Sequence, residues 1–127
     1  MAGSRATEEI MRFSMPHTFN SLQNLTVAIA SLIKSQGKRT WFGRDKSVIA
    51  YSKFLAEFKS TLHAMVLDGL ITEATPPADV IAKIQNAFDL FSRAFPNWQD
   101  VYGFVEYFFV AKEDEALAII ERLRGAP

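Results

Sequence analysis

Hydrophobic residues recur at alternating spacings of three and four along most of this chain, which is the periodicity of one face of an α-helix. The clearest case is an apolar seam in residues 46–67 that continues for roughly three heptads. Asp45 is a favourable N-cap and Asp68-Gly69 is a stop signal, so the pattern predicts a helix over 46–67 with Phe58 near the centre of its buried face. The seam consists of Val48, Tyr51, Leu55, Phe58, Leu62 and Met65.

The same alternation predicts helices over 20–36, 77–95 and 98–110, and a short last helix that ends at Gly125. Residues 98–110 carry apolar side chains on two sides, which is typical of a helix at the centre of a bundle or at an interface. On the strength of these helical alternations we also predict that no β-sheet is present. We therefore expect an all-α protein, an antiparallel bundle of four to five helices.

The N-terminal residues carry a much weaker pattern. Residues 1–17 are interpreted as a flexible N-terminal tail with at most one short turn starting at Thr7, and Pro16 is expected to end that turn. Residues 18–127 then form one helical-bundle domain, a length that matches the commonest domain size.

Basic and acidic residues are unevenly distributed along the chain. The net charge is zero, but residues 1–67 hold nine basic against four acidic residues, and residues 68–127 hold five against ten. We interpret this as basic and acidic helices that lie side by side in one bundle. The alternative is a polar molecule that docks head to tail or meets an acidic partner.

Residue types that carry catalysis are scarce. The chain has no Cys and two His, and no nucleophile–base pair or cluster of metal ligands can be assembled from the sequence. His63 flanks the apolar seam of residues 46–67 and is expected to be a partly buried structural histidine. We predict a non-enzymatic protein with no cofactor and no metal. No apolar run is long enough to span a membrane and the first residues do not resemble a signal peptide, so a cytoplasmic location is expected.

The connection between the first two predicted long helices combines basic and aromatic residues between glycines. Aromatic residues and Arg are enriched at binding hot spots, and aromatic with basic residues also suit single-stranded nucleic acid. The alternative is that the aromatic rings fold back as a lid on the end of the bundle. The predicted partner-binding residues are Lys38, Arg39, Trp41, Phe42 and Arg44.

The apolar surface of residues 98–110 exceeds what one bundle face needs. We predict that Trp98, Tyr102 and Phe109 lie at the interface of a homodimer. The leading function is a small adaptor, regulator or inhibitor that binds protein. One alternative is nucleic-acid binding through the basic aromatic loop; another is a hydrophobic ligand cavity lined by Phe88, Phe91, Phe104 and Phe108.

The residues from Tyr102 to Tyr107 resemble the RNP1 strand of RNA-recognition motifs, whose aromatic residues stack on RNA bases. Phe95, at the end of the preceding predicted helix, leads almost directly into Tyr102, which leaves no room for the strand that this fold places between them. Asp100 also stands where that motif carries a basic residue. We therefore predict a helix here.

Overall fold

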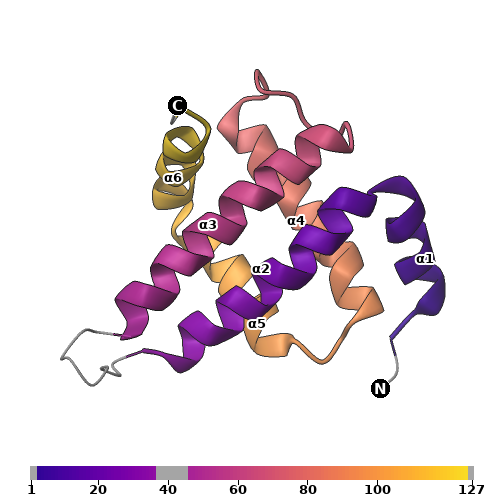
Figure 1. Cartoon of the computed structure of the whole chain (residues 1–127), viewed down its shortest axis with the longest axis horizontal. Helices are drawn as coiled ribbons and strands as arrows, with labels where there is room; N and C mark the ends of the chain where they lie inside the picture. The colour runs from indigo at the N-terminus through magenta and orange to yellow at the C-terminus, as the bar shows by residue number, and fades with distance from the viewer. Residues whose placement is uncertain (1–2, 37–45, 126–127) are drawn as a thin grey trace.

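The computed structural model describes residues 3–36 and 46–125. Within these ranges six α-helices and one π-helical segment pack into a single domain, and no strand occurs (Figure 1). The predicted all-α class is confirmed, whereas the predicted number of helices is too low. The elements are α1 (Arg5–Ser14), α2 (Pro16–Lys34), α3 (Lys46–Leu67), α4 (Pro77–Ala94), α5 (Gln99–Glu106), the π-helical segment η1 (Tyr107–Ala111) and α6 (Glu113–Gly125).

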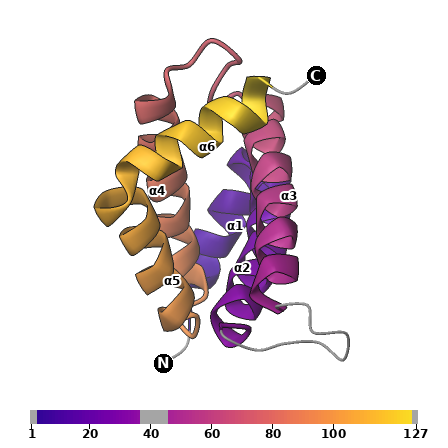
Figure 2. The ribbon, with the colours of Figure 1, turned by 90° about the vertical axis from the view of Figure 1, so that its left-hand side faces the viewer.

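The two long helices α2 and α3 lie side by side at the centre of the domain (Figure 1). α4 and α5 pack against α2, and α1 lies against α4 at one edge. α6 contacts both α3 and α4 and crosses them in the rotated view of Figure 2. The hydrophobic core therefore lies between the pair α2–α3 and the segment that runs from α4 to α6.

The N-terminal segment that the sequence predicted as a tail contains a packed helix. The Ser4 hydroxyl accepts a hydrogen bond from the backbone N–H of Thr7 at 3.1 Å, so Ser4 and not Thr7 caps α1. The Met11 side chain is completely buried. The backbone N–H of Ser4 donates to the carbonyl of Arg93 at the end of α4, with 2.9 Å between the two atoms. A helix with a single buried side chain has no repeated apolar spacing, so the sequence pattern did not reveal α1.

The start of α2 also differs from the prediction, because Pro16 begins the helix instead of ending a turn. Proline is favourable at the first helical position, where its missing N–H would have no partner in the helix. The N-cap residue Met15 makes no side-chain cap. The Asp68 carboxylate takes that role and accepts hydrogen bonds from the backbone N–H groups of His17 and Thr18. The cap therefore comes from a distant part of the chain.

The end of α3 matches the predicted stop signal. Gly69 has a φ of 75°, a left-handed conformation that glycine adopts without a steric penalty. The backbone N–H of Leu70 donates to the carbonyl of Met65 at 2.9 Å, and that of Gly69 to the carbonyl of Val66 at 3.0 Å. These two bonds are the Schellman pattern, which satisfies carbonyls at the end of a helix.

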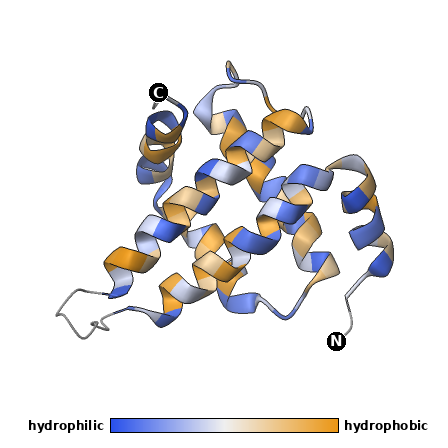
Figure 3. Ribbon diagram, viewed as in Figure 1, coloured by the Kyte–Doolittle hydropathy of each residue, from blue (hydrophilic) through white to orange (hydrophobic). Residues whose placement is uncertain are grey.

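The predicted buried face of α3 is correct in its second half and wrong at its start. Phe58 and Leu62 are buried and Leu55 is partly buried, but Val48 is 59% and Tyr51 38% exposed. Figure 3 shows an orange, hydrophobic turn close to the start of α3. The apolar seam thus begins before the point at which other described elements start to cover α3.

The sequence predicted an α-helix over 98–110, but residues 107–111, between α5 and α6, are wound more loosely than an α-helix. The backbone N–H of Lys112 donates to the carbonyl of Tyr107, five positions earlier, at 3.0 Å, which is the π-helical bonding pattern. The wider turn brings the neighbouring rings of Phe108 and Phe109 into the core together, with their centroids 5.0 Å apart.

The residues from Tyr102 to Tyr107 lie in α5 and η1, so the alternative of an RNP1 strand is contradicted. Within residues 3–36 and 46–125, none of the helices combines the length and the hydropathy needed to cross a lipid bilayer.

Candidate functional site

The five predicted partner-binding residues lie outside the described residues. The structure describes α2 up to Lys34 and the turn after it, and resumes with α3 at Lys46. The prediction that this connection recognises a partner therefore stays a prediction. The residues concerned are Lys38, Arg39, Trp41, Phe42 and Arg44.

The three predicted interface residues occupy different environments. Phe109 is only 5% exposed, and its ring centroid lies 5.8 Å from that of Phe58, so it belongs to the core of its own chain. This burial corrects the prediction that Phe109 faces a second chain. Tyr102 is partly buried, and Trp98 remains 37% exposed. Trp98 is therefore the member of this set that is available to a partner.

Tyr102 fixes the turn that presents Trp98. Its hydroxyl donates a hydrogen bond to the carbonyl of Phe95, at the end of α4, with an O–O distance of 2.5 Å. The side-chain amide of Gln99 donates to the carbonyl of Pro96 at 2.7 Å. Both donors lie on α5, so they close the turn between the two helices, and burial raises the pKa of Tyr102 to about 12. At neutral pH the tyrosine is therefore a permanent donor.

Two hollows flank Trp98, and we call them together the Trp98 groove. One has a volume of about 190 Å³ and the other of about 270 Å³, and both lie between α2 and the α4–α5 turn. α2 contributes Val27, which is 53% exposed, and Ala30 one turn later. Because Trp98 lines both hollows, it stands as a ridge between them. Lys34 and Asp100 give the end of the larger hollow one charge of each sign.

One residue that lines the smaller hollow carries a buried polar group without a partner. Thr26 on α2 lines it, and its hydroxyl is buried with no hydrogen-bond partner among the described residues. Buried polar atoms are nearly always hydrogen-bonded, so this hydroxyl is an exception within the fold, but its own burial keeps it from the surface of the hollow. The Trp98 groove therefore combines an exposed indole with the apolar side chains of Val27 and Ala30, an arrangement that suits binding.

The proposed cavity between four phenylalanines is not formed as predicted. Phe88 and Phe91 pack with each other at a centroid distance of 6.4 Å, while Phe104 and Phe108 stack at 5.8 Å. The second pair also contacts Phe54 on α3. The rings thus fill the core as two separate pairs.

The histidines show no constellation for catalysis. His63 is exposed, which corrects the expectation of a partly buried side chain. The Nδ1 atom of His17 lies 2.9 Å from the carboxylate of Asp68, but Asp68 is used as the cap of α2. In the part of the chain that the structure describes, no three His, Asp or Glu side chains gather as a metal site.

Sequence reasoning missed the roles of two residues that join distant segments of the chain. Asp68 caps α2, and Arg124 binds backbone carbonyls of the segment between α3 and α4. Both contacts join segments roughly fifty positions apart, which no local pattern reports. No protein-family model matches the chain, and no curated protein or solved structure matches it either, so its function rests on the residues described above.

Proposed function

We propose that this chain is a small non-enzymatic interaction protein that binds another protein chain through the Trp98 groove. The observation that carries the proposal is the exposed Trp98 side chain, which lines two neighbouring hollows. Tryptophan is among the residue types that most often dominate binding energy, and flanking hollows let a partner surround it and exclude water.

The way in which the groove is built supports this proposal. Because Tyr102 and Gln99 hold the turn that carries Trp98, little conformational freedom is left for binding to remove. The exposed Val27 extends the apolar surface along α2. A partner that covers the groove would therefore gain apolar burial at a low ordering cost.

The partner that we propose is a second copy of this chain. Phe13 on α1 is 91% exposed, and Ile10, one turn earlier on the same helix, is 57% exposed. An aromatic side chain this exposed contributes almost nothing to the stability of its own fold. In a twofold-symmetric dimer each Phe13 would enter the Trp98 groove of the other chain, so both Phe13 side chains and both grooves would be buried.

Sedimentation velocity at micromolar concentrations tests the proposal. The unmodified chain should sediment as a dimer, and Trp98→Ala and Phe13→Ala should each shift it to a monomer. Tyr107→Ala is the matched control, because Tyr107 is 53% exposed and lines neither hollow. Thermal melting of each variant confirms that the fold is retained.

A monomeric unmodified chain would overturn the dimer. A dimer that persists in Trp98→Ala would show that the groove is not its interface. A dimer lost in Trp98→Ala and kept in Phe13→Ala would leave the groove as the interface and remove Phe13 as its occupant.

A further inference from the structure

The outer face of α1 carries a regular row of exposed side chains. Arg5, Glu9 and Phe13 follow one another at a spacing of four, so they lie on one side of the helix. All three are exposed, whereas Met11, on the opposite side, is completely buried. This row, which we call the α1 row, presents a cation, an anion and an aromatic ring to solvent in that order.

The Trp98 groove offers groups that complement the α1 row. Its wall on α2 includes Val27, Ala30 and Lys34, at spacings of three and four. Lys34 and Asp100 are both exposed, line the same hollow and form no ion pair with each other. The groove is therefore apolar around Val27 and carries one charge of each sign at its other end.

The two surfaces also match in length. An α-helix rises about 1.5 Å per residue, so Arg5 and Phe13 lie about 12 Å apart along α1. By the same rise, Val27 and Lys34 lie about 10.5 Å apart along α2. A copy of α1 that lies in the groove therefore spans it from one end to the other.

The charges favour one direction of docking. The described residues that line the smaller hollow are all uncharged. A helix parallel to α2 would place Arg5 and Glu9 beside that hollow, where no opposite charge meets them. A helix antiparallel to α2 places Phe13 there and brings both charged side chains to the end that carries Lys34 and Asp100.

The α1 row and the groove are neighbours on the surface of one chain. The backbone N–H of Ser4 donates to the carbonyl of Arg93 at 2.9 Å, close to the turn that carries Trp98. A Cβ atom added to Gly3 would lie 1.8 Å from the carbonyl oxygen of Ala94, so the chain before α1 runs directly against the end of α4. Because a twofold interface takes the same surfaces from both chains, neighbouring surfaces are covered together.

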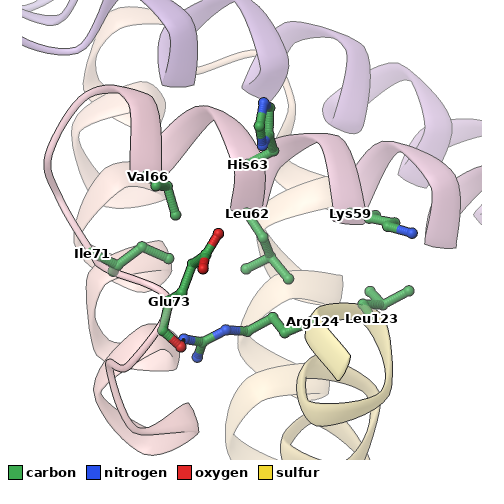
Figure 4. Close-up of a pocket in the computed structure, with 8 residues that line it drawn as sticks. All are labelled: Lys59, Leu62, His63, Val66, Ile71, Glu73, Leu123 and Arg124. Atoms are coloured by element: carbon green, nitrogen blue, oxygen red, sulfur yellow. Dashed lines mark hydrogen bonds between the residues drawn. The ribbon is translucent and has the colours of Figure 1, made fainter. Parts of the chain in front are cut away.

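The charged groups around a second hollow are arranged differently. A cavity of about 510 Å³ opens between α3, the α3–α4 connection and α6 (Figure 4). Figure 4 shows the Glu73 carboxylate pointing into this cavity and the Lys59 ammonium pointing away from Arg124. Arg124 donates hydrogen bonds to the carbonyls of Thr75 at 2.6 Å and Thr72 at 3.0 Å, which ties α6 to the connection. These charges do not converge on one point of a partner.

We propose that α1 of a second copy lies antiparallel to α2 in the Trp98 groove and is held there by two ion pairs. Phe13 of the second copy enters the smaller hollow. Its Glu9 carboxylate pairs with Lys34 of the first copy, and its Arg5 guanidinium pairs with Asp100. The docking mode rests on the dimer proposed above and adds the direction of α1 and the charges that fix its register.

Exchanging the two charges of one pair tests this docking mode. Lys34→Glu and Glu9→Lys should each raise the dissociation constant of the dimer about tenfold, because the twofold axis creates two such pairs and each exposed pair is worth about threefold. The double variant Glu9→Lys/Lys34→Glu should recover the dissociation constant of the unmodified chain. Sedimentation velocity over a concentration series measures these constants. The exchange of Arg5→Glu with Asp100→Arg should follow the same pattern.

A second double variant of the same net charge is the matched control. Lys53 is exposed on α3 and lines neither hollow. Glu9→Lys/Lys53→Glu therefore restores the net charge but leaves Lys34 opposite the new lysine. Its dissociation constant should stay as high as that of Glu9→Lys. Thermal melting of each variant checks that the fold is retained.

Failure of the docking mode and failure of the dimer give different results. A monomeric unmodified chain would overturn both. A dimer that Trp98→Ala and Phe13→Ala disrupt, but in which Glu9→Lys does not rescue Lys34→Glu, would keep the dimer and overturn the paired charges. Rescue by Lys53→Glu as well would show that net charge alone acts, and it would also overturn them.

Discussion

The carboxylate of Asp68, directly after α3, accepts a hydrogen bond from the backbone N–H of Thr18 in the first turn of α2, with 2.6 Å between the two atoms. The same carboxylate accepts from the backbone N–H of His17 at 3.3 Å, and the Asp68 side chain is only 2% exposed. One side chain therefore completes two otherwise unpaired donors at the start of α2 and ties it to the end of α3.

Replacing Asp68 with Asn should destabilise the protein by about 1–2 kcal/mol at neutral pH, because the two backbone N–H groups use different carboxylate oxygens and the amide keeps only one acceptor and no charge. Chemical denaturation measures the change in the free energy of unfolding. Asp89→Asn is the control, because Asp89 is exposed and its ion pair is with Arg93 on the same helix. Its effect should stay below about 0.5 kcal/mol. Equal effects of the two substitutions would contradict the role of the cap.

The same contact predicts a loss of stability in acid. Burial alone would raise the pKa of Asp68, but the hydrogen bonds from Thr18 and His17 outweigh it and hold the pKa below its ordinary value of 3.8. A carboxyl whose pKa is lower in the folded state stabilises above its unfolded pKa, and this contribution disappears as the pH falls through the folded pKa. The stability difference between the native chain and Asp68→Asn should therefore shrink as the pH falls below about 4.

Tyr102→Phe should cost about 1 kcal/mol, because it removes the hydrogen bond to the carbonyl of Phe95 and leaves that carbonyl unpaired. Burial raises the pKa of Tyr102 to about 12, above its ordinary value of 10. The contribution of the protonated tyrosine is therefore complete below pH 10 and is lost as the pH rises through about 12. Denaturation of both proteins at about pH 8 and about pH 11 should show their difference shrinking at the higher pH. A constant difference would contradict the buried environment.

Phe58→Ala should destabilise by about 3–5 kcal/mol, since Phe58 is 1% exposed and contacts the rings of Phe54, Phe108 and Phe109. Val48→Ala is the comparison on the same helix and in the same apolar seam. Because Val48 is 59% exposed, its truncation should change the free energy of unfolding by no more than about 0.5 kcal/mol. A large loss in Val48→Ala would mean that another surface covers the start of α3.

Arg124→Lys should destabilise by about 1–2 kcal/mol although the charge is kept. The guanidinium reaches three carbonyls of the α3–α4 connection, and a single ammonium cannot reproduce that geometry. Arg122→Lys, an exposed change on the same helix, should be neutral within about 0.5 kcal/mol. Hydrogen exchange of the backbone amides in residues 70–75 should accelerate in Arg124→Lys and stay the same in Arg122→Lys.

The local chemistry of the sequence determined most of the helices. Residues 46–67 form a helix as predicted, because the apolar spacing repeats over several turns and Asp68-Gly69 supplies a left-handed stop. The helices predicted over 77–95 and 20–36 are also present, with shifted ends. Repeated spacing and glycine conformation act between residues close in the chain, so the sequence carries them directly.

The tertiary structure decided which of these signals takes effect. Pro16 suits both the end of a turn and the start of a helix, and the cap from Asp68 selects the second. Val48 and Phe58 belong to the same apolar seam, yet one is exposed and the other buried, because the burial of a helix face depends on which neighbours lie against it. The Trp98 groove has the same origin, since α2 and the α4–α5 turn meet only in the folded chain. Contacts between distant residues follow from how the helices pack together, and no spacing along one helix encodes them.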